Sequence, residues 1–393
     1  MKIAHLCLAA IYVEGYAYQE NILPRIHKTK GHEVKIIAST ETYLANRQLG
    51  YTVAKTFLNE DSIPVTRLNY VRWLPKKFVR KLRLYNGLED ELDNFNPDII
   101  FLHDAQFWNT GTVARYVRSN PQVKVFSDCH TDFINSAKGF LSEKVLHRII
   151  YRYYISRIQH EVKKFYGVTP PRCEFLIDVY KIPRGKVEYL PLGYDDSRFS
   201  PDYLRSIRKE TRVRNGIPQD RFIIGTGGKF DDRKRLDLLV QACNQLGENL
   251  LDQIAIVLFG EPPASNAEAF SEIVDSSLVK IVYLGWQSPE QVSSIIASSD
   301  LMVFPGTHST LWEESLGLGI PAILRYWDGF DKLVDPEKFL TLTTGTVEEL
   351  SDKIQRMLID HEAYQVCLSE AKAKSCMFQY SDIAIRALGD EMS

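Results

Sequence analysis

Short, continuous apolar runs alternate with longer segments of helical periodicity along the chain, and this alternation constrains the fold more than any other feature. Runs that are apolar throughout, rather than at every second position, are typical of strands covered on both faces. Helical segments between such strands imply right-handed crossovers, so the sequence predicts an α/β protein with parallel sheets. The runs lie at residues 3–9, 33–38, 98–103, 124–129, 166–168, 187–190, 222–226, 254–259, 279–284, 301–304 and 321–324.

The runs fall into two groups, separated by a polar stretch at 193–215 that contains Asp195, Asp196 and Pro201. A chain of 393 residues is long enough for two domains. We expect one Rossmann-like domain over 1–200, joined by a C-terminal helix within 376–393 that crosses back to it, and a second over 201–375. Parallel open sheets bind ligands at the carboxyl ends of their strands. Two such domains facing each other across a cleft suit a reaction between two substrates.

Composition narrows the classes of protein without choosing one. The net charge of −2 gives no support for nucleic-acid binding. No apolar run approaches the roughly 18 residues that a membrane-spanning helix needs, and a buried first strand explains the apolar start better than a signal peptide does. The six cysteines show neither CxxC nor disulfide-like spacing, which favours reduced thiols in a cytoplasmic protein.

The first strand of the second half ends in Gly227, Gly228 and Lys229, and we expect Lys234 and Arg235 to open the next helix. Glycines allow a ligand to approach the backbone closely, and two ammonium groups there can converge on a diphosphate. The alternative is a solvated turn with surface lysines. Positive side chains in the first turn oppose the helix dipole, which favours a nearby anion.

A second cluster lies at 304–323, where a strand ends in a Pro-Gly turn and a helix is expected to begin near Ser309 or Thr310. The free backbone amides of a helix start can bind an anion. Glu314, one turn into this helix, can accept two hydrogen bonds from a ribose diol. Alternatively, Glu313 and Glu314 only complement the helix dipole.

Together with Leu284-Gly285-Trp286, these motifs resemble the donor domain of family-4 retaining glycosyltransferases, which have the GT-B fold. The run from Glu314 to Pro321 matches the second Glu of the family motif and the Gly-x-Pro that follows it. The resemblance implies that Glu314 holds the ribose, that Lys229 replaces the usual Arg and that Lys234 is the family Lys. It also implies a diphosphate site at the amides of Thr310 and Leu311, and a base site at Gly260, Glu261, Gly285 and Trp286.

One departure from the family motif concerns its first Glu, which normally contacts hydroxyls of the donor sugar. That residue should fall at position 306, where this chain has Gly306. His308 can replace part of its role, or it is merely a residue at the helix start. The identity of the donor sugar therefore stays open, and the nucleotide base, uridine, is expected only from its frequency in the family.

Polar groups also follow strands of the first half. His103 and Asp104 follow one strand, and His130 follows the next, with Asp132 close behind. We expect Glu14-Gly15-Tyr16 to open the first helix. The resemblance places His130 opposite the reacting sugar and Gly15 in a glycine loop near the donor phosphates. Either Asp104 or Asp132 orients the acceptor hydroxyl. His103 is either part of this site or a loop residue with a structural role.

The resemblance implies a metal-independent transfer with no cofactor beyond the nucleotide diphosphate sugar. Retaining enzymes of this fold generally show no convincing enzyme nucleophile, so Lys229 and Lys234 would stabilise the leaving diphosphate. The adjacent acids Asp231 and Asp232 lie in a turn, and we do not expect them to bind a metal. Two alternatives remain: a sugar-nucleotide epimerase of the same fold, and a non-catalytic nucleotide-sugar-binding homologue.

Two basic segments suggest a contact with a membrane surface. Residues 71–85 interleave six basic residues with apolar ones, and 144–164 is a second basic stretch with aromatic residues. A basic amphipathic segment can lie on an anionic membrane, although ordinary helices with one solvated face explain the pattern equally well. On the first reading the protein is peripheral on the inner face of the cell membrane. The acceptor would then be lipid-linked, as in bacterial surface-polysaccharide assembly, and the sugar a hexose or N-acetylhexosamine.

Overall fold

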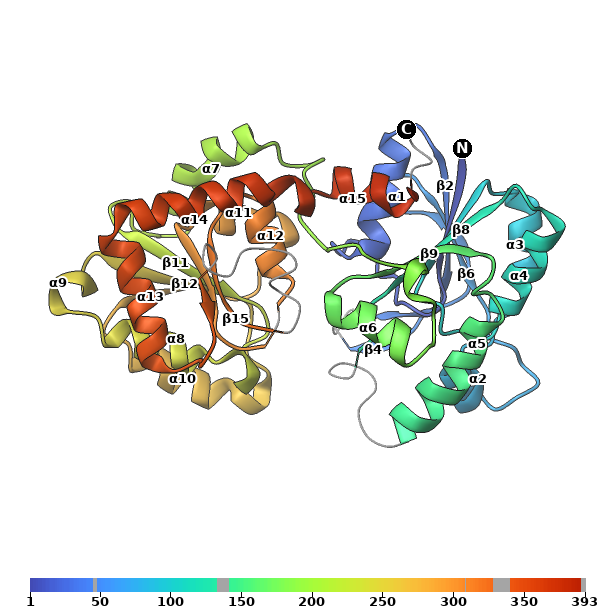
Figure 1. Ribbon diagram of the computed structural model, residues 1–393, viewed down its shortest axis with the longest axis horizontal. Coiled ribbons are helices and arrows are strands. Elements are labelled where there is room, and N and C mark those ends of the chain that lie inside the picture. The colour runs from blue at the N-terminus through green and yellow to red at the C-terminus, as the bar shows by residue number, and fades with distance from the viewer. Residues whose placement is uncertain (45–47, 133–140, 308, 328–339, 390–393) are drawn as a thin grey trace. The chain divides into compact units, whose positions relative to one another are not determined.

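The computed structural model describes residues 1–44, 48–132, 141–307, 309–327 and 340–389 (Figure 1). The chain forms two compact units. Unit 1 comprises Met1–Pro191 and Ile383–Ser393, and unit 2 comprises Leu192–Asp382. The boundary expected after residue 200 lies inside unit 2 in this division. Within the described ranges, no helix has the length and apolar character needed to cross a membrane.

Unit 1 is built on a sheet of eight strands in the order β10-β9-β8-β7-β1-β2-β6-β5. Neighbouring strands run parallel except for β5 and β6. A separate antiparallel hairpin joins β3 and β4. The strands are β1 (Lys2–Cys7), β2 (Glu33–Ser39), β3 (Glu41–Tyr43), β4 (Leu49–Tyr51), β5 (Thr56–Leu58), β6 (Pro64–Leu68), β7 (Ile99–His103), β8 (Lys124–Cys129), β9 (Val162–Gly167) and β10 (Val187–Tyr189).

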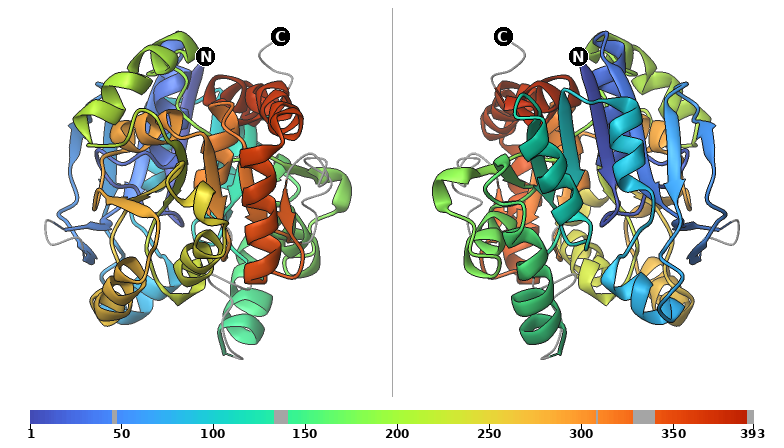
Figure 2. Two further views of the ribbon diagram at one scale, coloured as in Figure 1. Left: turned by 90° about the vertical axis from the view of Figure 1, so that its left-hand side faces the viewer. Right: turned by 90° about the vertical axis from the view of Figure 1, so that its right-hand side faces the viewer.

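Helices cover both faces of this sheet (Figure 2). The C-terminal helix α15 belongs to unit 1 through its last turns, where the Ala384 carbonyl lies 2.9 Å from His27 Nε2 and Tyr166 Oη donates to the Arg386 carbonyl. The expected return of the C-terminal segment to the first domain is therefore confirmed. The helices are α1 (Gln19–Thr29), α2 (Lys76–Leu82), α3 (Leu88–Phe95), α4 (Thr110–Ser119), the π-helical η1 (Leu141–Tyr151), α5 (Arg152–Ser156), α6 (Pro170–Asp178), the 3-10 turn η2 (Arg184–Lys186) and α15 (Tyr380–Ala387).

Unit 2 is built on a fully parallel sheet of six strands in the order β13-β12-β11-β14-β15-β16. Its interior strand β12 is buried at all six positions, as expected for a strand with helices on both faces. The strands are β11 (Phe222–Gly227), β12 (Ile254–Phe259), β13 (Lys280–Tyr283), β14 (Leu301–Phe304), β15 (Ala322–Arg325) and β16 (Thr341–Leu342).

The helices of unit 2 begin at recognisable sequence signals. Ser288 forms a capping box with Gln291 at the start of α11, and the side chains of Thr346 and Asp360 cap α13 and α14. These caps satisfy amides that a helix start would otherwise leave unpaired. The helical elements are α7 (Pro201–Arg214), η3 (Asp232–Lys234), α8 (Leu236–Asn244), α9 (Glu248–Leu251), η4 (Ala264–Asn266), α10 (Ala267–Asp275), α11 (Pro289–Ser298), α12 (Leu311–Gly317), α13 (Val347–Ile359), α14 (His361–Lys374) and η6 (Ser375–Phe378).

The structure confirms the predicted fold class of two parallel, Rossmann-like sheets and corrects two helix starts. Lys234 lies in the 3-10 turn η3 rather than in the first turn of α8, because Arg235 adopts a left-handed conformation (φ 53°) that separates the two elements. Similarly, α1 begins at Gln19 and not beside Gly15, whose positive φ of 75° belongs to the preceding loop.

Candidate functional site

A pocket of about 320 Å³ lies in unit 2 at the carboxyl ends of β11 and β12, where an open parallel sheet is expected to bind its ligand. It brings together six residues that the sequence predicted, from three loops and the start of α12: Gly228, Lys229, Gly260, Glu261, Trp286 and Leu311. Trp286 is half exposed and offers an indole surface to a planar ligand. The pocket is completed by Phe259, Gln287 and Val292.

Close backbone packing shapes the floor of this pocket. The amide of Gly228 donates to the carbonyl of Phe259, and the amide of Gly260 donates to the carbonyl of Gly285. A Cβ atom on Gly260 would come within 2.0 Å of the Gly228 carbonyl oxygen, and Gly260 has a φ of 114°. Because both features exclude an L side chain, glycine is required where the two strand ends meet.

Lys234 lies beside this pocket, with its Cε atom 3.8 Å from the position that a Cβ on Gly228 would occupy. Its side chain is partly buried, and burial lowers the pKa of its ammonium group. No carboxylate in the described part of the chain lies within ion-pair distance of Lys234. By contrast, its neighbours Arg233 and Arg235 form ion pairs with Asp231 and Asp237. A partly desolvated cation without a carboxylate partner favours an anionic ligand at this position.

Glu314 lies on α12 and accepts a hydrogen bond from the hydroxyl of Ser293 on α11. Burial raises the pKa of Glu314 to about 7, while the Ser293 hydrogen bond opposes this rise. Only one of its two oxygens is used in this contact, so the carboxyl group retains capacity for a further donor. Sequence inspection gave no role to Ser293, which reads as an ordinary polar residue on an amphipathic helix.

The predicted anion site at the start of α12 stays a prediction. The helix begins at Leu311 with Thr310 at the N-cap position, close to the expected start. The amides of Trp312 and Glu313 bond internally to the carbonyls of Ser309 and Thr310. His308 lies outside the described residues.

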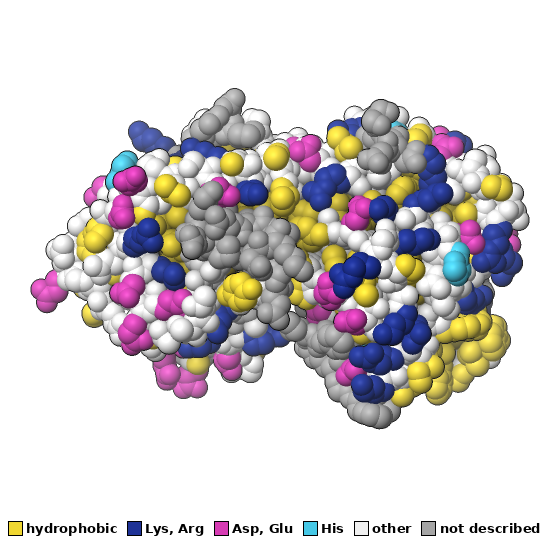
Figure 3. Space-filling view, in the orientation of Figure 1, with side chains coloured by type: hydrophobic (Ala, Val, Ile, Leu, Met, Phe, Trp, Pro, Cys, Tyr) yellow, Lys and Arg dark blue, Asp and Glu magenta, His cyan; other side chains and the backbone are white. Residues whose placement is uncertain are grey.

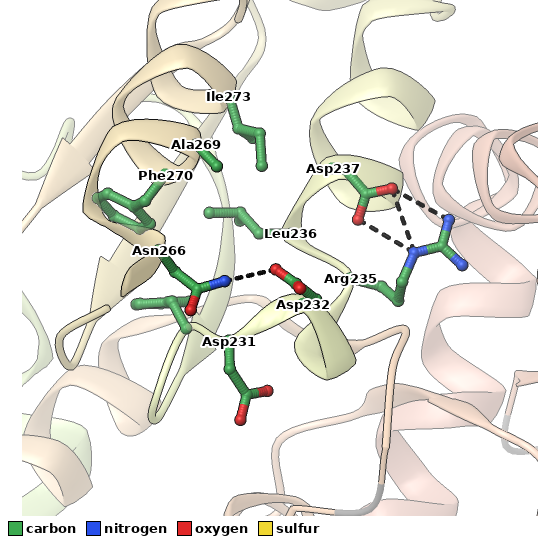
Figure 4. Close-up of a pocket in the computed structure, with 10 residues that line it drawn as sticks. Asp231, Asp232, Arg235, Leu236, Asp237, Asn266, Ala269, Phe270 and Ile273 are labelled. Atoms are coloured by element: carbon green, nitrogen blue, oxygen red, sulfur yellow. Dashed lines mark hydrogen bonds and ion pairs between the residues drawn. The ribbon is translucent and has the colours of Figure 1, made fainter. Parts of the chain in front are cut away.

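A neighbouring pocket of about 300 Å³ does not suit a diphosphate (Figure 4). Its rim carries the carboxylates of Asp231, Asp232 and Asp237, against the single cation Arg235. Asp231 caps the η3 turn and pairs with Arg233, and Asp232 accepts a hydrogen bond from Asn266. The adjacent acids therefore have structural partners, and the negative rim makes this the less suitable of the two pockets for a phosphate group.

The polar residues of unit 1 converge on Asp128, at the end of β8. Its Oδ1 accepts from the Asp104 amide at 2.9 Å, and its Oδ2 lies 2.9 Å from His103 Nδ1 and 3.5 Å from His130 Nε2. Gln19 donates to the same Oδ2 from α1. The parallel register that sets His103 opposite Asp128 explains this convergence. Asp104 and His130 are themselves joined, because the His130 amide donates to Asp104 Oδ1 at 3.2 Å.

The carboxylates around His130 control its charge. Burial alone would lower the pKa of His130, but Asp128, together with Glu20 and Asp104, raises it to about 9. At neutral pH His130 is therefore an imidazolium that donates hydrogen bonds, rather than a general base. Asp104 has a positive φ of 59°, an unusual conformation that Asp tolerates better than most residues and that occurs often at functional sites.

The other residues predicted in unit 1 are placed differently. Of the two candidates for the acceptor hydroxyl, Asp132 pairs with Arg172 at 3.1 Å, whereas Asp104 accepts a hydrogen bond from the His130 amide. Gly15 lies in the exposed loop between β1 and α1, where its amide donates to Glu60. The structure shows no contact between Gly15 and the group around Asp128 among the residues it describes.

Sequence inspection missed Asp128 and Gln19 as members of this group. Asp128 belongs to the same polar strand end as His130, but strand register is needed to show that it faces His103. Gln19 gives no signal in the sequence beyond being the first residue of a helix. His5 was a usable signal, because it is a polar residue within an otherwise apolar run, and the structure buries it completely.

Two family descriptions together match most of the chain. The family description "Glycosyl transferases group 1" matches residues 207–374, and "Glycosyltransferase Family 4" matches residues 20–198. The chain is 22% identical over 232 residues to D-inositol 3-phosphate glycosyltransferase of Nocardia farcinica, a match that covers 56% of this chain and 49% of that protein. It is 23% identical over 249 residues to alpha-galactosylglucosyldiacylglycerol synthase of Streptococcus pneumoniae, covering 62% of each. The chain thus spans about half to three fifths of the length of these relatives.

Among solved structures, HepE of Anabaena in complex with UDP matches with a TM-score of 0.67 and 15% identity, covering 98% of this chain and 97% of that one. The same protein has also been solved with UDP-glucose. At this identity the match shows the fold alone. The two parallel sheets and the two family matches define a glycosyltransferase of the GT-B fold. The chain belongs to the group 1, family 4 glycosyltransferases.

Proposed function

We propose that this protein transfers a sugar from a nucleotide diphosphate sugar, with uridine as the base, to a glycan or lipid-linked acceptor, with retention of anomeric configuration. The observation that carries the proposal is the pocket of unit 2. Lys229 and the aromatic ring system of Trp286 line this pocket, and Lys234 lies beside it. A nucleotide diphosphate needs these features, namely a planar surface for the base and cations for the charge that grows on the leaving diphosphate.

Glu314 completes the donor site in this proposal. Its free oxygen, together with the one now bonded to Ser293, accepts hydrogen bonds from the ribose diol. The amides around Thr310 and Leu311 contact the diphosphate, and His308 contacts the sugar. The UDP and UDP-glucose complexes of HepE, a protein of the same fold, support uridine as the base and a hexose as the sugar.

In unit 1, His130 and Asp104 contact the reacting sugar and the acceptor. The imidazolium of His130 donates a hydrogen bond to a sugar hydroxyl. Asp104 orients the acceptor hydroxyl by accepting a hydrogen bond from it. Burial raises the pKa of Asp104, while its neighbour His130 lowers it. The Gly15 loop borders the donor phosphates. No side chain is assigned as a nucleophile, so the protein acts by positioning and by stabilising the leaving group.

A lipid-linked acceptor is supported by the surface of unit 1. Figure 3 shows Lys and Arg side chains beside hydrophobic ones over the part of unit 1 that holds α5. The segments 71–85 and 144–164 meet there, since Tyr151 Oη donates to the Lys81 carbonyl. Trp73, Phe78 and Ile149 are 75%, 60% and 62% exposed. Exposed aromatic and aliphatic groups among lysines suit an anionic membrane surface, which would keep the enzyme at the inner face of the cell membrane.

The function is tested by incubating the full chain with a panel of nucleotide sugars, with and without glycan and lipid-linked acceptors. We expect nucleoside diphosphate release that depends on acceptor, and a product whose anomeric configuration by NMR matches the donor. Lys234→Ala should lose this activity, whereas Lys280→Ala, an exposed lysine on β13, should keep it. Interconversion of the sugar nucleotide without acceptor would instead indicate an epimerase. Tight binding without turnover in any mixture would indicate a non-catalytic homologue.

Membrane contact has its own test. The full chain should sediment with vesicles that contain phosphatidylglycerol and not with phosphatidylcholine alone. The double variant Lys76→Glu/Lys77→Glu should lose this binding, while Lys209→Glu/Lys280→Glu, with the same charge change on exposed lysines of unit 2, should retain it. Equal binding by both variants would contradict a contact through unit 1.

A further inference from the structure

Three buried histidines of unit 1 form one continuous chain of hydrogen bonds. His27 on α1 lies with its Nδ1 3.0 Å from Nε2 of His5 on β1, and His5 Nδ1 lies 3.0 Å from Nε2 of His103 at the end of β7. All three side chains are completely buried. Consecutive ring centroids lie 5.1 and 5.3 Å apart, with interplanar angles of 26° and 23°, and the facing ring nitrogens are 3.0 Å apart, which is hydrogen-bonding distance.

Both ends of this histidine chain meet an acceptor. His27 Nε2 lies 2.9 Å from the carbonyl oxygen of Ala384 on α15, which can only accept. At the other end, His103 Nδ1 lies 2.9 Å from Oδ2 of Asp128. All six ring nitrogens therefore take part in the four contacts, and the direction of each hydrogen bond follows from the carbonyl end. His27 donates to Ala384, His5 donates to His27, and His103 donates to His5.

Three neutral histidines carry too few hydrogens for the four contacts of this chain. Four contacts between nitrogen or oxygen atoms need four hydrogens, while three neutral imidazoles carry three. A contact without a hydrogen would set two lone pairs against each other in a buried site, which is costly. We propose that the chain holds one additional proton, as an imidazolium at His103 that donates to both His5 and the carboxylate of Asp128.

The surroundings favour His103 over the other positions for this charge. Burial lowers the pKa of both His5 and His27, and each has only other histidines or a carbonyl as its ring partners. Burial would raise the pKa of Asp128, but His103 and His130 lower it well below its usual range, so the carboxyl group stays ionised. The cation thus lies beside the one ionised group that contacts the chain.

This assignment makes His103 a positioning residue for His130. The His103 cation neutralises part of the charge on Asp128, which is the group that most strongly raises the pKa of His130. Other charged or titratable groups face the same carboxylate or His130: Glu20 from α1, Cys7 from β1, and Asp104, which itself lies near Arg83. The positioning role rests on the proposed function, whereas the proton count does not.

The proton is tested by NMR on the full chain labelled with ¹⁵N-histidine, using long-range ¹H–¹⁵N correlations at pH 7. The variant His130→Gln removes the other expected imidazolium, so its spectrum should still show one histidine ring with hydrogens on both nitrogens. The substitution His103→Gln should abolish the signal of that doubly protonated ring. His27 should carry its hydrogen on Nε2. A His103 ring with one bare nitrogen would overturn the proposal, as would a signal that persists in His103→Gln.

A second variant tests how the chain acts on His130. In His5→Phe, His103 no longer needs to donate through Nε2, so it should become neutral and leave the charge of Asp128 uncompensated. The midpoint of the His130 titration should then shift to higher pH than in the wild type. A role in packing alone would leave that midpoint unchanged and would overturn the positioning role. If the NMR results hold while no sugar transfer is found, the proposed function fails and the proton assignment stands.

Discussion

Gly306 packs directly against the backbone of Arg233. A Cβ atom at position 306 would lie 2.0 Å from the Arg233 carbonyl oxygen, and the neighbouring Thr307 amide donates to that same oxygen at 2.8 Å. The loop after β14 is therefore held against the turn that carries Lys234. This packing requires glycine at position 306. The family motif that the sequence resembles has a glutamate there. Position 306 therefore cannot supply the sugar contact that the resemblance assigns to such a glutamate.

Replacing Gly306 with glutamate should consequently fail to restore the family pattern. Because any side chain at this position displaces backbone rather than a flexible side chain, we expect Gly306→Glu to lower stability by roughly 1–3 kcal/mol and to weaken nucleotide binding. Gly185→Glu is the matched control, since a Cβ there meets no atom within 4 Å. Thermal unfolding and UDP titration measure both effects. Tighter donor binding by Gly306→Glu would show that the loop adapts, contrary to this account.

Lys234 should contribute to binding of the diphosphate and little to binding of the nucleoside. Hydrogen bonds to charged groups are worth about 1.5–3 kcal/mol, so Lys234→Ala should weaken UDP binding by roughly 10- to 150-fold. Uridine binding should remain nearly unchanged. Arg235→Ala, which removes a neighbouring cation already paired with Asp237, is the control and should leave UDP affinity intact. Calorimetric titration of UDP and uridine distinguishes these outcomes, and equal losses for both ligands would exclude a diphosphate contact.

Donor affinity should depend on pH through Glu314. Its pKa of about 7 in the free protein means that the carboxyl group is largely protonated below that pH, and a ribose diol requires an acceptor. The Kd for UDP-glucose, whose diphosphate does not titrate in this range, should therefore decrease as pH rises from 6 and level off above about 7. Glu314→Gln should bind more weakly with a flat profile, and Glu290→Gln, an exposed residue on α11, should behave as the wild type. A wild-type profile that stays flat would contradict the role.

The stability of unit 1 should fall with rising pH through His130. The folded-state pKa of about 9 lies above the ordinary value of 6.5, so between these values the folded state binds a proton that the unfolded state has released. The stabilisation is complete below about pH 6.5 and is lost as pH rises towards 9. His130→Gln should reduce the slope of the free energy of unfolding against pH in this window, measured by urea denaturation. His160→Gln, at an exposed position, should retain the wild-type slope.

The sequence predicted the parts of the fold that depend on continuous burial. Strands β8, β12 and β14 have the predicted bounds, because a strand covered on both faces is apolar from end to end. The short strands β3, β4, β5 and β16 were missed, since two or three residues carry too little pattern to be recognised. The five-residue strand β6 was also missed, because Thr66 and Arg67 interrupt its apolar pattern. The start of α8 was placed two residues too early, because the left-handed conformation of Arg235 has no signal in the sequence.

The candidate site was predictable where residue type and strand end coincide, as at Gly228, Lys229, Gly260 and Trp286, which line one pocket. It was not predictable where pairing between distant strands decides the chemistry. The histidine chain joins positions on α1, β1 and β7, and only the register of the sheet brings His103 opposite Asp128.

The central claim is that a pyrophosphate binds beside Lys229 and Lys234 in unit 2. The most direct measurement is a crystal structure of the full chain soaked with UDP or UDP-glucose. We expect diphosphate density within hydrogen-bonding distance of both ammonium groups, with the base against Trp286 and the ribose at Glu314. Diphosphate density elsewhere, for instance in the pocket bordered by Asp231 and Asp237, would contradict this claim.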